Sequence, residues 1–378
     1  MGEPKRVLHI LQRMEAGGTQ ALLMNIYRKI DRSKLQFDFL VVYSEKQFYD
    51  DEVLNLGGKI YRSTFREDLN LFKFCKYLNS FFREHNTEYD IVHVHAYTIG
   101  YFCLKYAEKW GIPVRIAHSH SNAVSKDFTR FFKYPMKKLF LIHANEYFAC
   151  SKEAGDFLFG NKGFKILNNS IDSKKFIYND DNREQFRKQL GIDDCFVIGH
   201  VGRFHIEKNH KFLLEIFNEI LKINSKAKLL LTGSGPLEKE IREIVRQKNL
   251  EDAVIFLGNR NDMENVFHAL DIFVLPSSFE GLGIAAIEAQ AAGIPSICSD
   301  GLPEIANISP LFYKVSLRKN VAEWAQVCIQ AAGNKYAHMD MHEYVINAGF
   351  DIDVTSKEVQ QFYLEKIQCI DLDRCSNS

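Results

Sequence analysis

The stretch Pro276-Ser-Ser-Phe-Glu-Gly-Leu-Gly-Ile-Ala-Ala-Ile-Glu288 joins two elements of different character. Before it, Asp271-Ile-Phe-Val-Leu275 is a short apolar run that is typical of a buried parallel strand. From Ile284 to Ala292 the chain is rich in alanine, and Gly293 and Pro295 follow, which predicts a helix that ends there. The order strand, glycine-containing loop, helix indicates an open α/β sheet.

The loop within this stretch is a candidate anion site. Gly281 and Gly283 let the backbone approach a ligand closely, and the amides of Leu282 and Gly283 at the start of the helix favour a phosphate. Glu280 and Glu288 frame the loop, and because eight helical residues span ~12 Å, they cannot share one proton or one metal ion. They can contact two ends of an elongated ligand such as a nucleotide sugar, since carboxylates accept hydrogen bonds from hydroxyls. The alternative interpretation is two surface acids that flank a turn.

The length and the charge of the chain exclude some classes of protein. A chain of 378 residues can form two domains with separate cores. With 48 basic and 48 acidic residues it has no net charge, which argues against a general nucleic-acid binder. Residues 1–180 hold 27 Lys and Arg against 20 Asp and Glu, net +7, and the remainder is net −7. The basic half fits an anionic membrane surface or a phosphorylated acceptor, or it reflects ordinary surface variation.

The cysteines and the apolar runs predict the compartment. None of the eight cysteines forms a C-x-x-C pair or a disulfide spacing, so a reducing cytoplasm is the expected location. Residues 1–6 contain no signal-peptide core, and no apolar run approaches ~18 residues, so no membrane span is expected. Residues 126–142 mix aromatic and basic side chains, which fits either a helix lying on anionic lipid or an amphipathic core helix.

The first half of the chain opens with another strand, loop and helix. The strand Arg6 to Leu11 is followed by Gly17 and Gly18, which open a helix that runs to about Lys29. This order suits a phosphate, although a lone Gly-Gly pair is also found in ordinary turns. The spacing is not G-x-G-x-x-G, which weakens a dinucleotide-binding interpretation.

Histidines follow two later strands. His93 and His95 lie on one face of the strand 90–95, and since no third ligand is evident, structural hydrogen bonding is their expected role. The strand that begins at Val114 leads to His118 and His120, at the edge where open α/β sheets bind ligands. Helix-capping or loop histidines are the alternative there.

Two cations follow the first strand of the second half. The strand Phe196 to Gly202 is followed at once by Arg203, and Lys208 comes five residues later. Cations just past a strand end can neutralise a diphosphate. Alone, two cations after a strand are a weak signal.

These residues together resemble one enzyme family. Glu280 and Glu288 reproduce the E-x7-E motif, Gly202 to Asn209 reproduces G-R-x4-K-N, and both are typical of retaining glycosyltransferases of family 4 with the GT-B fold. The resemblance covers nearly the whole chain and is most specific from Gly199 to Glu304. The segments A-H-S-H and N-N-S-I-D resemble enzymes of bacterial exopolysaccharide or capsule assembly.

The resemblance implies two doubly wound, Rossmann-like α/β domains that face a cleft. The alternation of strands and helices in both halves agrees with this architecture. We expect an N-terminal acceptor-side domain over residues 1–172 and a C-terminal nucleotide-sugar-binding domain over residues 173–355. A last helix, about residues 356–378, is expected to pack back on the first domain.

The resemblance also implies roles for individual residues. Arg203 and Lys208 would hold the donor phosphates and stabilise the leaving group, Glu288 the ribose hydroxyls and Glu280 the sugar hydroxyls. A histidine, His118 or His120, would lie near the sugar and the attacking hydroxyl. The expected catalytic residues are His118, His120, Glu280, Arg203 and Lys208. The expected donor-binding residues are Gly17, Gly18, Ser151, Arg203, Lys208, Arg260, Glu280, Gly281, Leu282, Gly283 and Glu288. No metal and no cofactor is expected, since the nucleotide sugar is a co-substrate and UDP a product.

The implied reaction is transfer of a hexose or N-acetylhexosamine, with retention, from a nucleotide sugar that we expect to be a UDP-sugar. The acceptor would be a hydroxyl of a glycan or of a polyprenyl-diphosphate-linked saccharide, at the inner face of the plasma membrane. Two alternatives stay open: a sugar-nucleotide epimerase of GT-B fold, and a non-catalytic nucleotide-sugar-binding subunit of a larger synthase.

Overall fold

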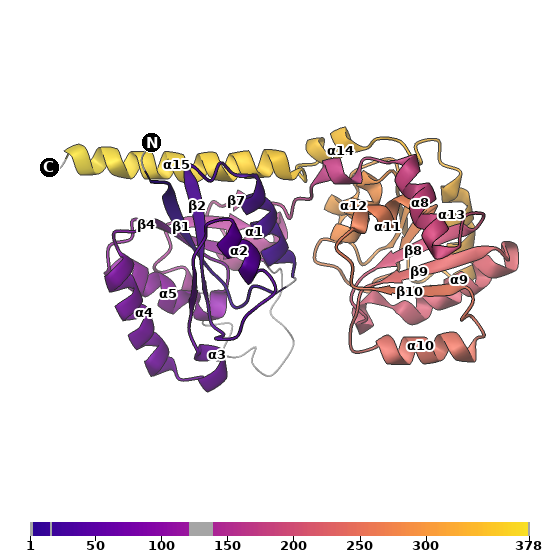
Figure 1. Ribbon diagram of the computed structural model, residues 1–378, viewed down its shortest axis with the longest axis horizontal. Helices are drawn as coiled ribbons and strands as arrows, with labels where there is room; N and C mark the ends of the chain where they lie inside the picture. Colours follow the sequence, from indigo (N-terminus) through magenta and orange to yellow (C-terminus); the bar gives the residue numbers. More distant parts are fainter. Residues whose placement is uncertain (1–2, 16, 121–138, 377–378) are drawn as a thin grey trace. The chain divides into compact units, whose positions relative to one another are not determined.

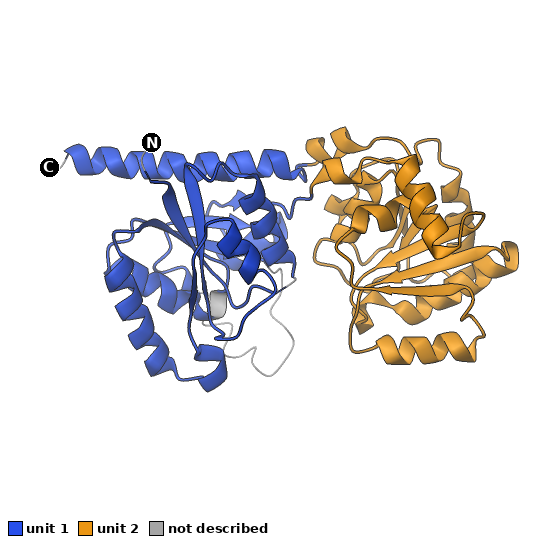
Figure 2. Cartoon of the chain, viewed as in Figure 1, with its two compact units in different colours: residues 1–171, 349–378 blue, residues 172–348 orange. Residues whose placement is uncertain are grey.

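The computed structural model describes residues 3–15, 17–120 and 139–376, and the chain divides into two compact units. Unit 1 comprises residues 1–171 and 349–378, and unit 2 comprises residues 172–348 (Figure 2). The return to unit 1 lies at residue 349, whereas the sequence placed it at residue 356. The Ile171 amide donates to the Phe350 carbonyl (2.8 Å) and the Ile352 amide donates to the Ile171 carbonyl (2.9 Å), so the outgoing and returning segments pair there.

Unit 1 is built on a sheet of seven parallel strands in the order β3-β2-β1-β4-β5-β6-β7 (Figure 1). Its strands are β1 (Lys5–Ile10), β2 (Leu35–Val41), β3 (Ile60–Arg62), β4 (Tyr89–Val94), β5 (Val114–Ser119), β6 (Glu146–Ala149) and β7 (Lys165–Ile166). Its helices in the described residues include α1 (Gly18–Lys29), α2 (Asp50–Asn55), α3 (Phe65–Asp68), α4 (Leu71–His85), α5 (Tyr97–Lys109), α7 (Lys152–Phe159) and α15 (Ile352–Ser376). The strand order reverses between β1 and β4, and this reversal is where doubly wound sheets bind ligands.

The last helix belongs to the core of unit 1. All seven residues of β2 are buried, as expected for a strand with helices on both faces of its sheet. On α15, Val359, Phe362 and Tyr363 are buried in the same apolar cluster as Phe37 of β2. Burial of one such side chain contributes about 1.5–3 kcal/mol, so α15 stabilises unit 1 although it lies far along the sequence.

Unit 2 repeats the plan with six parallel strands in the order β10-β9-β8-β11-β12-β13. Its strands are β8 (Phe196–Val201), β9 (Ala227–Thr232), β10 (Val254–Gly258), β11 (Ile272–Leu275), β12 (Ser296–Ser299) and β13 (Phe312–Val315). Its helices are α8 (Asp180–Leu190), α9 (His210–Ile223), α10 (Glu238–Gln247), α11 (Met263–His268), α12 (Ile284–Ala291), α13 (Val321–Ala332) and α14 (His342–Asn347), with 3-10 turns η1 (Ser173–Phe176), η2 (Ile206–Lys208) and η3 (Glu304–Ala306). The prediction of two doubly wound parallel α/β sheets is confirmed.

Two short edge strands were missed from the sequence. These are β7 in unit 1 and β13 in unit 2, and the sequence predicted neither of them. Neither strand has the continuous apolar run of the inner strands, because each lies at an edge of its sheet and is partly exposed.

Two sequence predictions concern the membrane: a helix over residues 126–142 and the lack of a membrane span. The helix predicted over residues 126–142 lies outside the described residues as far as residue 138. Among the described residues, no helix combines the length and the apolar character that crossing a membrane requires.

Candidate active site

Unit 2 brings two of the predicted residues into contact at the carboxyl edge of its sheet. Lys208 ends the 3-10 turn after β8, and Glu280 lies in the loop after β11, beside the point where the strand order reverses. Lys208 Nζ lies 2.5 Å from Glu280 Oε1, and the Ser277 hydroxyl donates to the same oxygen at 2.6 Å. One carboxylate oxygen is therefore fixed by two donors, and the described residues leave the other oxygen of Glu280 without a hydrogen bond.

Arg203 lies on the same loop as Lys208 and differs from it in being unengaged. Its side chain is exposed, and no hydrogen bond or ion pair to it occurs among the described residues. A guanidinium that keeps all its donors available suits a diphosphate, which it can bind through two parallel hydrogen bonds.

Glycine is required at one predicted position in the loop before α12 and at one further position, Gly301, in the turn after β12. Gly283 caps α12 with φ +80°, a left-handed conformation that favours glycine. Gly281 has open space around its Cα, so its lack of a side chain is not required by packing. At Gly301, a Cβ would lie 2.5 Å from the Ser277 carbonyl oxygen, so this glycine lets the turn after β12 approach the loop. Leu282, half-buried, precedes the amides at the start of α12.

Glu288 lies on α12 in surroundings that favour its neutral form. Burial, with a smaller effect of the Glu264 charge, raises the pKa of Glu288 to about 8. No hydrogen bond to its side chain occurs among the described residues. A half-buried carboxyl group without partners is suited to bind a ligand that brings hydroxyls, because those hydroxyls would supply the missing donors.

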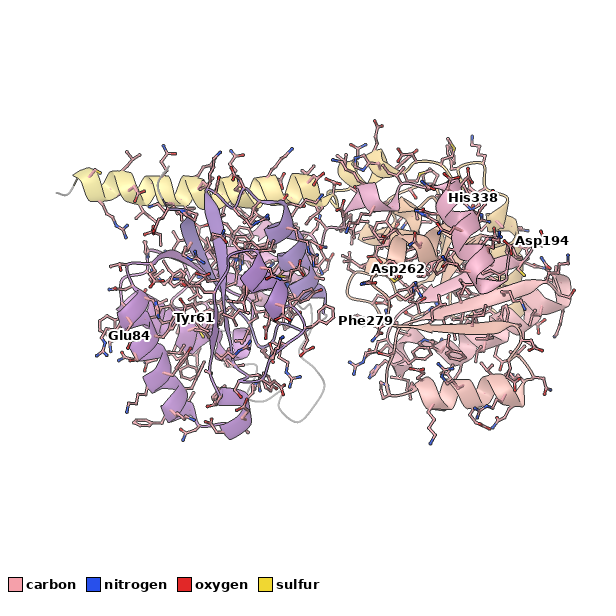
Figure 3. All side chains as sticks on the ribbon, in the orientation of Figure 1. Tyr61, Glu84, Asp194, Asp262, Phe279 and His338 are labelled. Atoms are coloured by element: carbon pink, nitrogen blue, oxygen red, sulfur yellow. The ribbon has the colours of Figure 1, made fainter. Side chains whose placement is uncertain are left out.

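Arg260 is engaged within the protein. Its guanidinium donates to both carboxylate oxygens of Asp262, at 2.8 and 2.6 Å, and lies over the Phe186 ring (Asp262 is labelled in Figure 3). The same view labels Phe279, next to Glu280 in the loop, whose side chain is exposed. The structure therefore brings Lys208 and Glu280 together and leaves Arg260 in a local ion pair.

In unit 1, five histidines gather where β1, β4 and β5 end, and they form two hydrogen-bonded chains. In the first chain, His93 Nδ1 lies 2.6 Å from the Tyr363 hydroxyl, and His93 Nε2 lies 3.0 Å from His118 Nδ1. In the second, His95 lies between His9 (3.1 Å) and His120 (2.9 Å). The members are His9, His93, His95, His118 and His120.

All five rings are neutral at pH 7. Burial lowers the pKa of His9 and of His120 to about 3. Burial, together with neighbouring histidines, lowers the pKa of His93, His95 and His118 well below the ordinary value. Each ring therefore carries one N–H donor and one acceptor nitrogen.

The sequence showed no third ligand beside His93 and His95, and the structure places His9 there. His9 with both of them, and likewise His95 with His118 and His120, place nitrogen atoms within 4.8 Å of one another. However, the His118 and His120 rings stack with centroids 3.9 Å apart and an interplanar angle of 28°. Since a nitrogen lone pair lies in the plane of its ring, stacked rings direct their lone pairs side by side instead of at one ion. This arrangement fits hydrogen-bonded chains better than a metal centre.

A cavity of about 280 Å³ adjoins one end of each chain, His118 in the first and His120 in the second, which we call the outer ends. Its lining includes His118 and His120, together with Thr19 and Gln20 from the first turn of α1. The predicted glycine loop therefore leads into this cavity: Gly17 precedes α1, Gly18 begins it, and no side chain caps that helix. Ser151 has another role, because its hydroxyl accepts from the Ala154 amide (3.1 Å) and caps α7.

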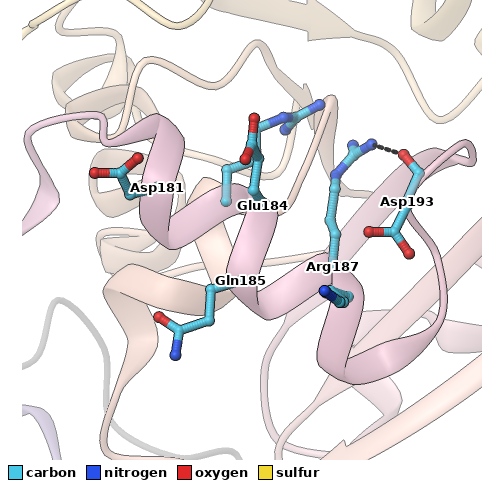
Figure 4. Close-up of a pocket in the computed structure, with 7 residues that line it drawn as sticks. Asp181, Glu184, Gln185, Arg187 and Asp193 are labelled. Atoms are coloured by element: carbon cyan, nitrogen blue, oxygen red, sulfur yellow. Dashed lines mark hydrogen bonds between the residues drawn. The ribbon is translucent and has the colours of Figure 1, made fainter.

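A larger hollow of about 590 Å³ lies along α8, away from the residues discussed above (Figure 4). Its two arginines are fully used inside unit 2. Arg183 donates to the Leu270 carbonyl (2.7 Å) and Arg187 to the Ala269 carbonyl (2.9 Å), and both pair with Asp271. These contacts anchor α8 to the sheet, so neither arginine of the hollow is free to bind an anion.

Sequence reasoning missed four residues of these two edges. Ser277 lies within the stretch from Pro276 to Glu288 and Gly301 follows β12, and neither has a signal beyond that position. His9 had a signal, since it lies one residue before the end of a strand that precedes a glycine loop. Tyr363 had none, because it is 270 residues from its partner His93.

Comparisons with known proteins agree with this geometry. Residues 16–174 match the family described as Glycosyltransferase Family 4, and residues 182–309 match Glycosyl transferases group 1. The "Putative glycosyltransferase EpsF" of Bacillus subtilis is 36% identical over 87% of this chain and 88% of its own length. An Escherichia coli UDP-Gal:alpha-D-GlcNAc-diphosphoundecaprenol alpha-1,3-galactosyltransferase is 27% identical over 70% of this chain and 72% of its own. The crystal structure of Anabaena HepE in complex with UDP and glucose is 16% identical, with a TM-score of 0.75, over 94% of this chain and 98% of HepE.

Proposed function

This chain belongs to the GT-B glycosyltransferases of family 4, and from that premise we propose that it moves a hexose or N-acetylhexosamine from a UDP-sugar to a hydroxyl, with retention of configuration. The acceptor would be a glycan or a lipid-linked saccharide in cell-surface polysaccharide synthesis. The donor preference is supported by HepE, which binds UDP and glucose, and the acceptor class by the E. coli galactosyltransferase, whose named substrate is a diphosphoundecaprenol-linked sugar.

The observation that carries the proposal is the contact between Lys208 and Glu280 beside the unengaged Arg203. Transfer from a nucleotide sugar develops negative charge on the leaving diphosphate, and fixed cations stabilise that charge. In our proposal Arg203 and Lys208 do so, and the amides at the start of α12 add to their effect. No metal ion is needed for this role.

The two glutamates would hold the two ends of the donor. Glu280 keeps one oxygen on Lys208 and Ser277, and its other oxygen would accept from sugar hydroxyls. Glu288 would accept from the ribose hydroxyls, which restore hydrogen bonds to a carboxyl group that otherwise has none. The cavity beside His118 and His120 would hold the sugar and the acceptor hydroxyl.

The test is to mix the purified protein with UDP-, GDP-, ADP- and dTDP-sugars and to follow nucleotide release by NMR. We expect slow release of UDP from one UDP-hexose, with the α-configured sugar appearing first. Initial appearance of the β-configured sugar would contradict retention. Conversion of one UDP-sugar into another without release would favour an epimerase, and binding that never leads to release, even with membrane lipid extract added, would favour a non-catalytic subunit.

A further inference from the structure

The two histidine chains of unit 1 differ at their inner ends. One chain ends on the Tyr363 hydroxyl, which meets His93 Nδ1 at 2.6 Å. The other ends on His9, whose Nε2 is buried and has no partner among the described residues. At the outer ends, His118 Nε2 and His120 Nδ1 are buried and unpartnered, and both residues line the cavity.

Tyr363 fixes the direction of hydrogen-bond donation along its chain. Its side chain is 1% exposed, and burial raises its pKa, so the hydroxyl keeps its proton. The described residues offer this proton no acceptor except His93, and a buried hydroxyl proton without an acceptor is costly. The hydroxyl therefore donates, which makes His93 Nδ1 an acceptor and leaves the ring proton of His93 on Nε2.

The direction of donation at His93 also determines the tautomer of His118. His93 Nε2–H donates to His118 Nδ1 (3.0 Å), so the proton of the neutral His118 ring must be on Nε2. The second chain has no such anchor, because His9, His95 and His120 can donate in either direction and leave one unpartnered N–H and one unpartnered acceptor nitrogen in each case. The two cavity histidines are therefore different: His118 is a fixed donor and His120 is not.

We propose that Tyr363 is a positioning residue that acts through His93 to hold His118 as its Nε2–H tautomer, so that His118 offers a hydrogen-bond donor to an oxygen in the cavity. That this oxygen belongs to the sugar or the acceptor rests on the proposed function. The proton arrangement does not rest on it.

The test uses the full-length protein with ¹⁵N-labelled histidine and long-range ¹H–¹⁵N spectra, which distinguish the two tautomers of each ring. His118→Asn assigns the His118 signals. In the wild type we expect His118 with its proton on Nε2. In Tyr363→Phe the two directions of the chain become equivalent, so the Nε2–H form of His118 should fall to about half.

Tyr27→Phe is the matched control. Tyr27 is also fully buried in the apolar core of unit 1, but its hydroxyl bonds to Gln36 and not to a histidine. Both variants lose one buried hydroxyl, so a nonspecific effect of that loss would appear in both. We expect Tyr27→Phe to leave the His118 tautomer unchanged.

Turnover separates this proposal from the proposed function. We expect Tyr363→Phe to lower kcat about twofold, in proportion to the lost tautomer, with the donor KM unchanged. A wild-type His118 proton on Nδ1, or a tautomer that Tyr363→Phe does not shift, would overturn the proposal. A shifted tautomer with unchanged kcat would overturn its use in the reaction, whereas a wild type inactive towards every nucleotide sugar would refute the proposed function and leave the tautomer result standing.

Discussion

The carboxyl edges of the sheets in units 1 and 2 have the same topology and opposite chemistry. Each is the carboxyl edge of a doubly wound sheet at the point where strand order reverses. In unit 1 this edge carries buried, neutral histidines that bond to one another. In unit 2 it carries Lys208 paired with Glu280 and an exposed, unengaged Arg203.

The difference indicates a division of labour between the two edges. Neutral imidazoles that are linked in chains discriminate hydrogen-bond donors from acceptors, which suits hydroxyl groups. Free or fixed cations suit a diphosphate, whose charge increases as the glycosidic bond breaks. Our account is therefore that unit 2 binds the nucleotide and stabilises the leaving group, and unit 1 orients the hydroxyls.

The largest effect should come from removing the leaving-group cation in unit 2. We expect Lys208→Ala to lower turnover by about 10²–10³-fold, because stabilisation of the developing phosphate charge is lost. Steady-state rates of UDP release measure this. Lys211→Ala is the control, since Lys211 is exposed and pairs with Glu240 at 2.5 Å. Near-normal turnover of Lys208→Ala would contradict the leaving-group role that we propose for unit 2.

A pH titration should give the next largest effect. Glu288 has its pKa raised to about 8, so below that pH it is protonated in the free protein. Ribose hydroxyls that donate to the carboxylate favour its charged form, so binding lowers the pKa and affinity increases with pH until about 8. We expect UDP-glucose, whose diphosphate does not titrate in this range, to bind about tenfold more tightly at pH 8.5 than at pH 6.5.

Calorimetric titrations at a series of pH values measure this slope, and Glu288→Gln supplies the comparison. Glutamine cannot titrate, so its profile should be flat. The same slope in both proteins would mean that another group is responsible.

Removal of the cavity-facing nitrogen in unit 1 should have an intermediate effect. The amide of asparagine reaches about as far as imidazole Nδ1, so His118→Asn keeps a partner for His93 and loses Nε2. We expect turnover to fall about tenfold from the lost hydrogen bond, with His85→Asn, on the last turn of α4 and paired with Glu88, as the control. Unchanged turnover of His118→Asn would show that the histidines of unit 1 have no role in sugar transfer.

The smallest effect should come from removing metal ions. We expect dialysis against EDTA to leave turnover within error, because in our proposal protein cations and amides take the place of a metal at the diphosphate. Turnover before and after dialysis, and after adding Mg²⁺ or Mn²⁺, measures this. Loss of activity that either ion restores would overturn the metal-free mechanism.

The sequence predicted β1, β4, β5, β8 and β11 because each is a short run dominated by apolar side chains. It missed β7 and β13, which lie at sheet edges and lack such a run. It predicted Lys208 and Glu280 as site residues because each belongs to a motif with a fixed spacing, G-R-x4-K-N and E-x7-E. The contact between the two side chains is known only from the structure. It could not reveal Tyr363, since long-range packing of α15 and not local spacing sets that contact.

The most direct test of the division of labour is the equilibrium affinity for UDP of the wild type, Glu288→Ala and His118→Asn, measured by calorimetry at one pH above 8. We predict that Glu288→Ala weakens UDP binding about 10-fold or more through lost bonds to the ribose, while His118→Asn binds UDP as the wild type does. Unchanged affinity in Glu288→Ala, or a comparable loss in His118→Asn, would contradict the account.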